Sequence, residues 1–393
     1  MSDAYIVSAV RTPVARAFKG GFRNFRPDDL LAHALTEALA EVPDLDPARV
    51  EDVIVGCAMP EAEQGMNVAR IGALLAGLPD SVPGVTVNRF CSSGLQTVAM
   101  AADRIRLGEA DVMIAAGTET MTMVPMMGHK VAMNPRVFQD DNVAIAYGMG
   151  ITAEKVAKQW DISRQAQEEF AYRSHQKAIA AIDGGEFTEI RPVTVTSRVP
   201  DPNTGQVREI QSVVDTDEGP RRDTTPEALG KLRTVFDAKG TVTAGTSSQM
   251  SDGAGALILV SERVLKELNL EPLAVFRGFS VAGVKPEIMG IGPIEAIPRV
   301  CKQTGINTSE LDWIELNEAF AAQALAVIQT TELDPDKVNP LGGAIALGHP
   351  LGATGAILSA KLIHGLKRRN QRYGMVTMCI GTGMGAAGIF ERL

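Results

Sequence analysis

Two cysteines and one histidine of this 393-residue chain stand in settings that suit covalent chemistry. Cys91 follows a short strand-like segment, residues 85–87, and precedes Leu95 and Val98, which begin a helical apolar stripe, so the pattern predicts Cys91 at a helix N-terminus. Unpaired N–H groups and the positive end of the helix dipole favour a thiolate there, which predicts a nucleophile. A lone cysteine is more often a buried structural residue, so the prediction depends on partners elsewhere.

Candidate partners follow in the C-terminal part of the chain. His349 lies in a glycine-dense segment, residues 339–356, Cys379 follows the strand-like run 374–378, and Asn317 begins a polar loop after an apolar strand. Loops at strand ends are where α/β proteins place their binding and catalytic residues. We therefore expect these side chains and Cys91 to form one site.

These motifs resemble those of the thiolases, which make or break a carbon–carbon bond between two acyl groups with coenzyme A. The matching segments are Asn88-Arg89-Phe90-Cys91-Ser92-Ser93-Gly94, Asn317-Glu318-Ala319-Phe320, Gly342-Gly343-Ala344-Ile345-Ala346-Leu347-Gly348-His349-Pro350 and Cys379-Ile380-Gly381-Thr382-Gly383. Their order and spacing match from Arg11 to Arg392, so the resemblance covers the whole chain.

The elements that must position these residues alternate along the chain. Apolar runs predict strands at 4–10, 53–56, 111–117, 256–260 and 274–278, and helical stripes predict helices at 28–40 and 94–106. This alternation predicts an α/β fold with a parallel or mixed sheet covered by helices, and the second half repeats the order coarsely.

The resemblance implies more: a duplicated, layered α-β-α-β-α fold with a loop domain inserted in the first half. On this basis we expect residues 1–117 and 243–270 to form the first half, 118–242 the inserted domain and 271–393 the second half. Six methionines between residues 121 and 149 suit an adaptable apolar tunnel for an acyl or pantetheine chain, with packing of loops over a core as the alternative.

By resemblance, Cys91 is the nucleophile that carries the acyl group, and His349 is the general base for Cys91 and for the coenzyme A thiol. Cys379 is the second acid/base. Asn317 is expected to hold a water that stabilises an enolate with His349, and the N–H groups of Cys91 and Gly381 to bind the tetrahedral oxyanion. The alternatives are that Asn317 caps a helix beginning near residue 319 and that 381–383 is simply a tight turn.

The resemblance also implies coenzyme A contacts. Arg221 is expected near the adenine and phosphates, Ser248 and Met289 along the pantetheine, and Phe320 in the lining of the site, although paired arginines such as 221–222 are usually solvated. Two positions, Gly148 and Ala228, depart from the short-chain biosynthetic thiolases, whereas residues 124–130 resemble the degradative enzymes.

The predicted activity is therefore cleavage of 3-ketoacyl-CoA by coenzyme A, in fatty-acid β-oxidation, through an acyl-cysteine intermediate. Coenzyme A is expected as a co-substrate, with no tightly bound cofactor and no metal. The alternatives are a biosynthetic acetyl-CoA acetyltransferase, a decarboxylating ketoacyl synthase, and a non-catalytic acyl-CoA or lipid-binding relative. Glycines at 381–385 lead into a strand and not a helix, which disfavours a dinucleotide site.

Composition bounds these expectations. A net charge of −9 disfavours nucleic acid, four dispersed cysteines disfavour a disulfide framework or a zinc site, and no apolar run is long enough to span a membrane. We expect a cytoplasmic protein, since the N-terminus shows no signal segment. The resemblance implies a homodimer or homotetramer, possibly with a hydratase/dehydrogenase subunit of β-oxidation.

Overall fold

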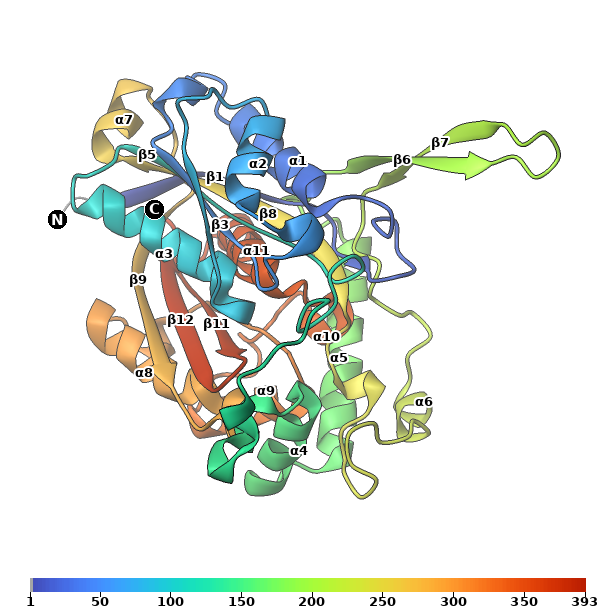
Figure 1. Cartoon of the computed structure of the whole chain (residues 1–393). Helices are drawn as coiled ribbons and strands as arrows, with labels where there is room; N and C mark the ends of the chain where they lie inside the picture. Colours follow the sequence, from blue (N-terminus) through green and yellow to red (C-terminus); the bar gives the residue numbers. More distant parts are fainter. Residues whose placement is uncertain (1–2) are drawn as a thin grey trace.

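The computed structural model describes residues 3–393, and in this part of the chain ten strands form one mixed sheet (Figure 1). The first half holds β1 (Ala4–Arg11), β2 (Ala15–Arg16), α1 (Pro27–Ala40), β3 (Asp52–Gly56), α2 (Val68–Leu75), β4 (Gly84–Val87), α3 (Ser93–Arg106), β5 (Val112–Thr120), β8 (Ser251–Ser261) and α7 (Glu262–Glu267). The second half holds β9 (Ala274–Gly283), α8 (Gly292–Thr304), β10 (Trp313–Leu316), α9 (Ala321–Thr330), α10 (Ala344–Leu347), α11 (Thr354–Arg368), β11 (Tyr373–Ile380) and β12 (Met384–Glu391).

The strand order repeats in the two halves. The first half runs β1-β8-β5-β3-β4, and the second runs β9-β12-β11-β10, continued by a parallel bridge between Ile314 and Val338. The two half-sheets join where β1 pairs with β9 over two residues, Tyr5 and Ile6. The predicted duplicated α/β fold is therefore confirmed, including the strands and helices that periodicity indicated.

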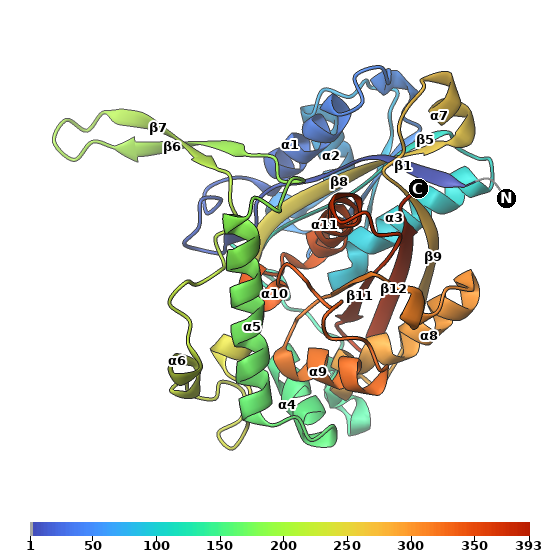
Figure 2. The ribbon, with the colours of Figure 1, turned by 180° about the vertical axis from the view of Figure 1, so that it is seen from behind.

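Helices form three layers around the two half-sheets (Figure 2). Helices α1 and α2 pack on the outer face of the first half, and α8 and α9 on the outer face of the second. Helices α3 and α11 lie between the half-sheets, where Leu95 and Leu362 share one apolar cluster with strands of both halves. This arrangement is the expected α-β-α-β-α layering.

The two central helices cross in direct backbone contact. A Cβ atom at Gly94 of α3 would lie 2.5 Å from the backbone nitrogen of Ala356, and one at Gly355 of α11 would lie 2.0 Å from that of Leu95. Only glycine permits this approach. Because the crossing is near the N-terminus of each helix, it brings the loops that precede α3 and α11 side by side.

The segment between β5 and β8 contains α4 (Met149–Gln159), α5 (Arg164–Asp183), β6 (Val193–Pro200), β7 (Val207–Val214) and α6 (Pro226–Gly230). Strands β6 and β7 form a hairpin that projects from the body of the molecule, and neither this hairpin nor α4 was expected from the sequence (Figures 1 and 2). Strand β5 continues to Thr120, beyond the predicted boundary at residue 117. The division of the chain into three domains stays a prediction.

A buried ion cluster ties this segment to β1. The guanidinium of Arg11 donates to Glu189 at 2.9 Å and to both carboxylate oxygens of Asp217 at 2.7 and 2.9 Å. All three side chains are almost fully buried, so loss of Arg11 would leave two buried carboxylates without their cation. The segment is thus anchored at the end of β1, close to Gly348 and Pro350 of the loop that contains His349.

Within residues 3–393, no helix is both long and apolar enough to cross a membrane.

Candidate active site

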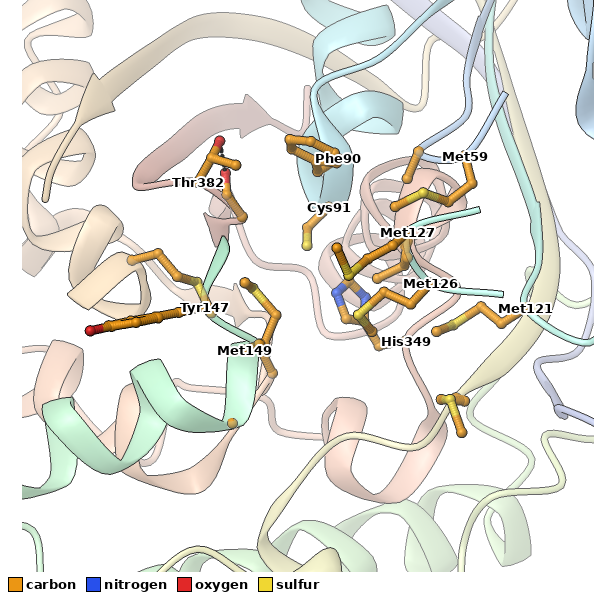
Figure 3. A pocket seen from close by; sticks show the side chains of 18 of the residues that line it. Met59, Phe90, Cys91, Met121, Met126, Met127, Tyr147, Met149, His349 and Thr382 are labelled. Carbon is orange, nitrogen blue, oxygen red and sulfur yellow. Dashed lines mark hydrogen bonds between the residues drawn. The ribbon is translucent and has the colours of Figure 1, made fainter. Parts of the chain in front are cut away.

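A cavity of about 1140 Å³ opens where the two halves and the inserted segment meet. Cys91, His349, Cys379 and Gly381 line it, as do Ser248, Met289 and Phe320 of the expected coenzyme A contacts. Figure 3 shows that Cys91 and His349 face the same space, with Met126 and Met127 close to His349 and Met149 on the opposite side. The structure therefore brings together residues that lie almost 290 positions apart in the chain, from 91 to 379.

Methionine dominates the apolar part of the cavity wall. The lining methionines, eight of the chain's 16, are Met59, Met121, Met126, Met127, Met133, Met149, Met250 and Met289. Methionine side chains are flexible and adapt to irregular apolar ligands. The methionine-rich segment thus lines the cavity, which favours the tunnel interpretation over simple packing of loops.

The turn that presents Cys91 is held in an unusual conformation. Phe90 has φ 44°, in the left-handed region that bulky residues rarely adopt. The side chain of Asn88 accepts a hydrogen bond from the Phe90 nitrogen at 2.8 Å, and the Ser93 hydroxyl donates to the Phe90 carbonyl at 2.7 Å. Cys91 lies in the short helical turn Phe90–Ser92 just before α3, as predicted.

The predicted preference for a thiolate at Cys91 is wrong. Burial raises the pKa of the thiol to about 11, although the backbone N–H groups of Gly381 and Cys91 act in the opposite direction. The physical reason is desolvation: Cys91 is half-buried in the wall of an apolar cavity, where the charged form is disfavoured more than two N–H groups can offset. Cys91 is therefore a thiol at neutral pH and needs a base to become a nucleophile.

His349 has the properties of such a base. Burial lowers its pKa to about 4, so the imidazole is neutral at physiological pH. Its Nδ1 lies 2.6 Å from the Thr354 hydroxyl, and its Nε2 lies 3.3 Å from Nδ2 of Asn317. With the proton on Nδ1 and donated to Thr354, Nε2 is the unprotonated nitrogen: it accepts the long hydrogen bond from Nδ2 of Asn317 and is the ring atom that can take up a proton.

Gly348 fixes the backbone that presents this imidazole. It has φ 103°, and a Cβ atom there would lie 2.3 Å from the Ser251 hydroxyl oxygen. Only glycine satisfies both conditions. The next residue, His349, donates its backbone N–H to the carbonyl of Gln249 at 3.2 Å. This hydrogen bond joins the loop to the segment that directly precedes β8.

Asn317 and Cys379 complete the polar set. Asn317 is almost fully buried behind His349 and does not line the cavity; within residues 3–393 its Oδ1 has no hydrogen-bond partner. Helix α9 begins at Ala321 with Phe320 as its N-cap residue, so the alternative that Asn317 caps this helix is wrong. Cys379 is fully buried near the end of β11, and burial, followed by the nearby Cys91, raises its pKa well above that of a free thiol.

The loop after Cys379 is a tight turn, as the alternative interpretation proposed, and it also serves the site. Thr382 and Gly383 adopt φ 66° and 90° between β11 and β12, and the N–H of Gly381 faces the sulfur of Cys91. An N–H held by a turn is a preorganised donor.

Arg221 differs from the other expected coenzyme A contacts. Its side chain is exposed and does not line the cavity, and its backbone N–H donates to Nδ1 of His175 at 3.2 Å. Among the lining residues within the described chain, Glu61 is the one formally charged side chain. An anionic phosphate group would therefore have to lie outside the apolar cavity.

No group of three or more His, Cys, Asp or Glu side chains within the described range could hold a metal ion.

Comparison with known families identifies this architecture. Residues 4–263 match the thiolase N-terminal domain and residues 270–392 match the thiolase C-terminal domain. The chain belongs to the thiolase family. Within this family it is 51% identical to the 3-ketoacyl-CoA thiolase of Bacillus subtilis, with all of both chains covered. It is 46% identical to the peroxisomal 3-ketoacyl-CoA thiolase A of Mus musculus, covering 99% of this chain and 91% of the relative.

Solved thiolase structures share the fold over the full length. The Bacillus anthracis acetyl-CoA acetyltransferase matches with a TM-score of 0.90 and 39% identity, covering 100% of this chain and 99% of that one. Human mitochondrial 3-ketoacyl-CoA thiolase matches with a TM-score of 0.88, 37% identity and the same coverage. The two similarities are nearly equal, so backbone shape does not separate the two activities.

Thr354 is a site residue that sequence reasoning missed in this thiolase. It is the first residue of α11 and 2% exposed, and its hydroxyl touches the imidazole of His349. A signal was present, since the five-residue spacing from His349 across a turn suits a side chain that orients the ring. The same spacing is common in loops without such a role, so it did not single out Thr354.

We predict that Thr354→Val slows alkylation of Cys91 by iodoacetamide at neutral pH by about ten- to a hundredfold, on the scale known for partners that orient metal-bound histidines. Valine removes the acceptor of the Nδ1 proton, so the ring is no longer held with Nε2 free. Thr354→Ser, which keeps the hydroxyl, is the matched control and should react at close to the wild-type rate. Equal rates for the valine and serine variants would contradict the assignment.

Proposed function

We infer that this protein cleaves 3-ketoacyl-CoA with coenzyme A, giving acetyl-CoA and an acyl-CoA shortened by two carbons. The observation that carries this inference is one cavity that joins a buried thiol, a neutral imidazole and a second thiol in a chain of the thiolase family. The similarity to 3-ketoacyl-CoA thiolases over the full chain supports it. The enzyme is an acyltransferase.

We propose the following first half-reaction. Nε2 of His349 removes the proton of Cys91 as the sulfur attacks the C3 ketone of the substrate. The tetrahedral oxyanion accepts hydrogen bonds from the N–H groups of Cys91 and Gly381, the two donors that already face the sulfur. The C2–C3 bond then breaks, its electron pair passes to the acetyl-CoA enolate, and the acyl group stays on Cys91 as a thioester.

Cys379 and Asn317 act on the departing enolate. Cys379 donates its proton to C2, which releases acetyl-CoA and leaves a thiolate; the proton held by His349 restores Cys379. The buried, partnerless Oδ1 of Asn317 suits a bound water, which together with His349 would stabilise the enolate oxygen. A fully buried thiol is a weak acid, so it yields its proton only to a strong base such as an enolate carbon.

In the second half-reaction coenzyme A takes the place of acetyl-CoA. His349 removes the proton of the coenzyme A thiol, the resulting thiolate attacks the thioester, and the Cys91 thiolate leaves and recovers that proton. Each proton and electron pair is then back where it began. Catalysis of this kind uses coenzyme A as a co-substrate and calls on no other cofactor.

The coenzyme A molecule is proposed to enter past Ser248, Met289 and Phe320, with its phosphates outside the cavity near Arg221. The location of these residues supports this: the first three line the cavity, and Arg221 is exposed and carries a positive charge. The cytoplasmic location and a hydratase/dehydrogenase partner stay predictions.

A biosynthetic acetyl-CoA acetyltransferase is the second candidate, favoured by the equally close fold of the Bacillus anthracis enzyme. The two activities share their chemistry and differ in the space offered to the acyl chain. The cavity of about 1140 Å³ must hold the pantetheine as well as the acyl chain, and its methionine-rich lining can adapt to a longer chain, which favours the longer substrates.

We predict that kcat/KM is higher for a C10 than for a C4 3-ketoacyl-CoA. Ala132 lines the cavity, and Ala132→Phe should fill part of it and lower the C10-to-C4 ratio by about tenfold or more. Cys91→Ala is the control and should cleave neither substrate. Turnover of the C4 substrate alone would favour the acetyltransferase, and no cleavage of either substrate by the wild type would refute the proposed function.

We also propose that two copies pair through β4. This strand is the edge of the sheet, bonded to β3 on one side only, and exposed apolar side chains surround it: Met66, Leu74, Leu75 and Val85. An open edge beside apolar surface is suited to pairing with an identical strand about a two-fold axis.

Light scattering should then give twice the chain mass of 41.7 kDa. Val85→Lys places a charge in the centre of the edge and should give monomers. A wild-type monomer, or a Val85→Lys variant with unchanged mass, would contradict the proposed interface. A wild-type mass four times that of the chain would require a second interface besides the one at β4.

A further inference from the structure

Glu119, near the end of β5, is a buried carboxylate to which the mechanism so far gives no role. It is fully buried, and its Oε2 accepts hydrogen bonds from the backbone N–H of Ala58 at 2.7 Å and of Gly352 at 2.8 Å. Its Oε1 accepts from Nε2 of Gln64 at 2.6 Å and from the N–H of Met59 at 3.3 Å. One side chain thus binds three separate segments of the chain.

These segments belong to both halves of the molecule and enclose the nucleophile. Gly352 lies in the turn between His349 and α11, and in the same turn the N–H of Leu351 donates to the carbonyl of His349 at 2.9 Å. Ala58 and Leu351 belong to the small apolar cluster against which Cys91 packs. Through two hydrogen bonds, Glu119 therefore joins the backbone beside Cys91 to the backbone that carries His349.

The contacts of Glu119 leave no room for a side chain at Gly352. A Cβ atom at Gly352 would lie 2.8 Å from Oε2 of Glu119 and 2.5 Å from the nitrogen of Ala58, so the three groups are in close contact. All the polar neighbours of the carboxylate are donors: three backbone N–H groups, the amide of Gln64 and, at 3.8 Å, the thiol of Cys57. Burial raises the pKa of Glu119, and the hydrogen bonds from these neighbours act in the opposite direction. A protonated acid would need an acceptor, so a set of neighbours made up of donors favours the ionised form.

We propose that ionised Glu119 is a positioning residue of the thiolysis reaction: it sets the distance between the imidazole of His349 and the thiol of Cys91 by holding the His349 turn of the second half against the first half. This rests on the proposed function, because it assumes that the two side chains exchange a proton. The charge also has a cost, since Glu119 adds to the effect of burial in raising the pKa of Cys91. The positioning role explains why a negative charge is present at Glu119 although that charge disfavours the thiolate form of Cys91.

The test compares Glu119→Gln with Glu119→Asp. Glutamine keeps the shape but offers an NH₂ group to N–H donors, and aspartate keeps the charge but is too short to reach both Ala58 and Gly352. Both variants should lower kcat for C10 3-ketoacyl-CoA by about 100-fold, the cost of a displacement of roughly 1 Å. KM should change by less than about threefold, because the substrate contacts remain.

Alkylation of Cys91 by iodoacetamide separates charge from position. At neutral pH both variants should be alkylated more slowly than the wild type, because a displaced His349 no longer removes the proton of Cys91. At mildly alkaline pH, where the base matters less, Glu119→Gln should regain rate, because removal of the negative charge lowers the pKa of Cys91. Glu119→Asp should show no such gain. If the glutamine variant does not fold, the aspartate variant carries the test through its kcat.

Leu35→Ala in α1 is the matched stability control, since Leu35 is fully buried in the outer apolar cluster of the first half, away from the cavity lining. It should lower the melting temperature and leave kcat unchanged.

Wild-type kcat in the aspartate or glutamine variant would overturn the proposal, as would an equal loss of kcat in Leu35→Ala. If the wild type cleaves no 3-ketoacyl-CoA, the proposed function fails, and equal alkylation rates in all three Glu119 forms would separately refute the role of Glu119.

Discussion

The backbone contact between α3 and α11 is the constraint on which the site depends. Each helix follows the loop of one reactive residue, Cys91 or His349, and the two loops meet only because the helices cross without intervening side chains. A methyl group at Gly94 or Gly355 would push the helices apart, and with them the thiol and the imidazole. The two half-sheets, the outer helices and the buried Arg11 cluster can be understood as the frame that holds this crossing in place.

Burial in this frame sets the chemistry of the site. The same desolvation raises the pKa of Cys91 to about 11 and lowers that of His349 to about 4, so both groups are neutral over the physiological range. A neutral pair differs from the thiolate–imidazolium pairs of many cysteine enzymes. The neutral pair places no charge in the apolar cavity before the reaction. The Cys91 thiolate forms only when the thiol proton moves to His349. The donors at Cys91 and Gly381 then stabilise the oxyanion that forms next.

Much of this could be predicted from the sequence, because local signals were strong. Strand–helix alternation predicted an α/β fold with a sheet covered by helices, and the turn residues around Cys91, His349 and Cys379 predicted the loops that carry chemistry. The duplication was implied by the resemblance to the thiolases. The sign of the Cys91 pKa shift could not be predicted, since it depends on how deeply the sulfur is buried by segments distant in the chain. The hairpin of β6 and β7 was missed because most of both strands is exposed, and only Val193, Val195 and Val214 at its base join the apolar core. Thr354 contacts His349 across one local turn, but the same spacing is common in loops without such a role. Glu119 acts through contacts made only when the two halves meet.

The central claim is that Cys91, and not Cys379, carries the acyl group. The most direct measurement is incubation of the protein with acetyl-CoA in the absence of an acceptor, rapid acid quenching, proteolysis and mass spectrometry of the two cysteine peptides. The account predicts an acetyl group on the Cys91 peptide, no acetyl group on the Cys379 peptide, and much slower labelling in His349→Asn, where no base removes the proton of Cys91. Acetylation of Cys379, or no covalent intermediate in the wild type, would contradict it.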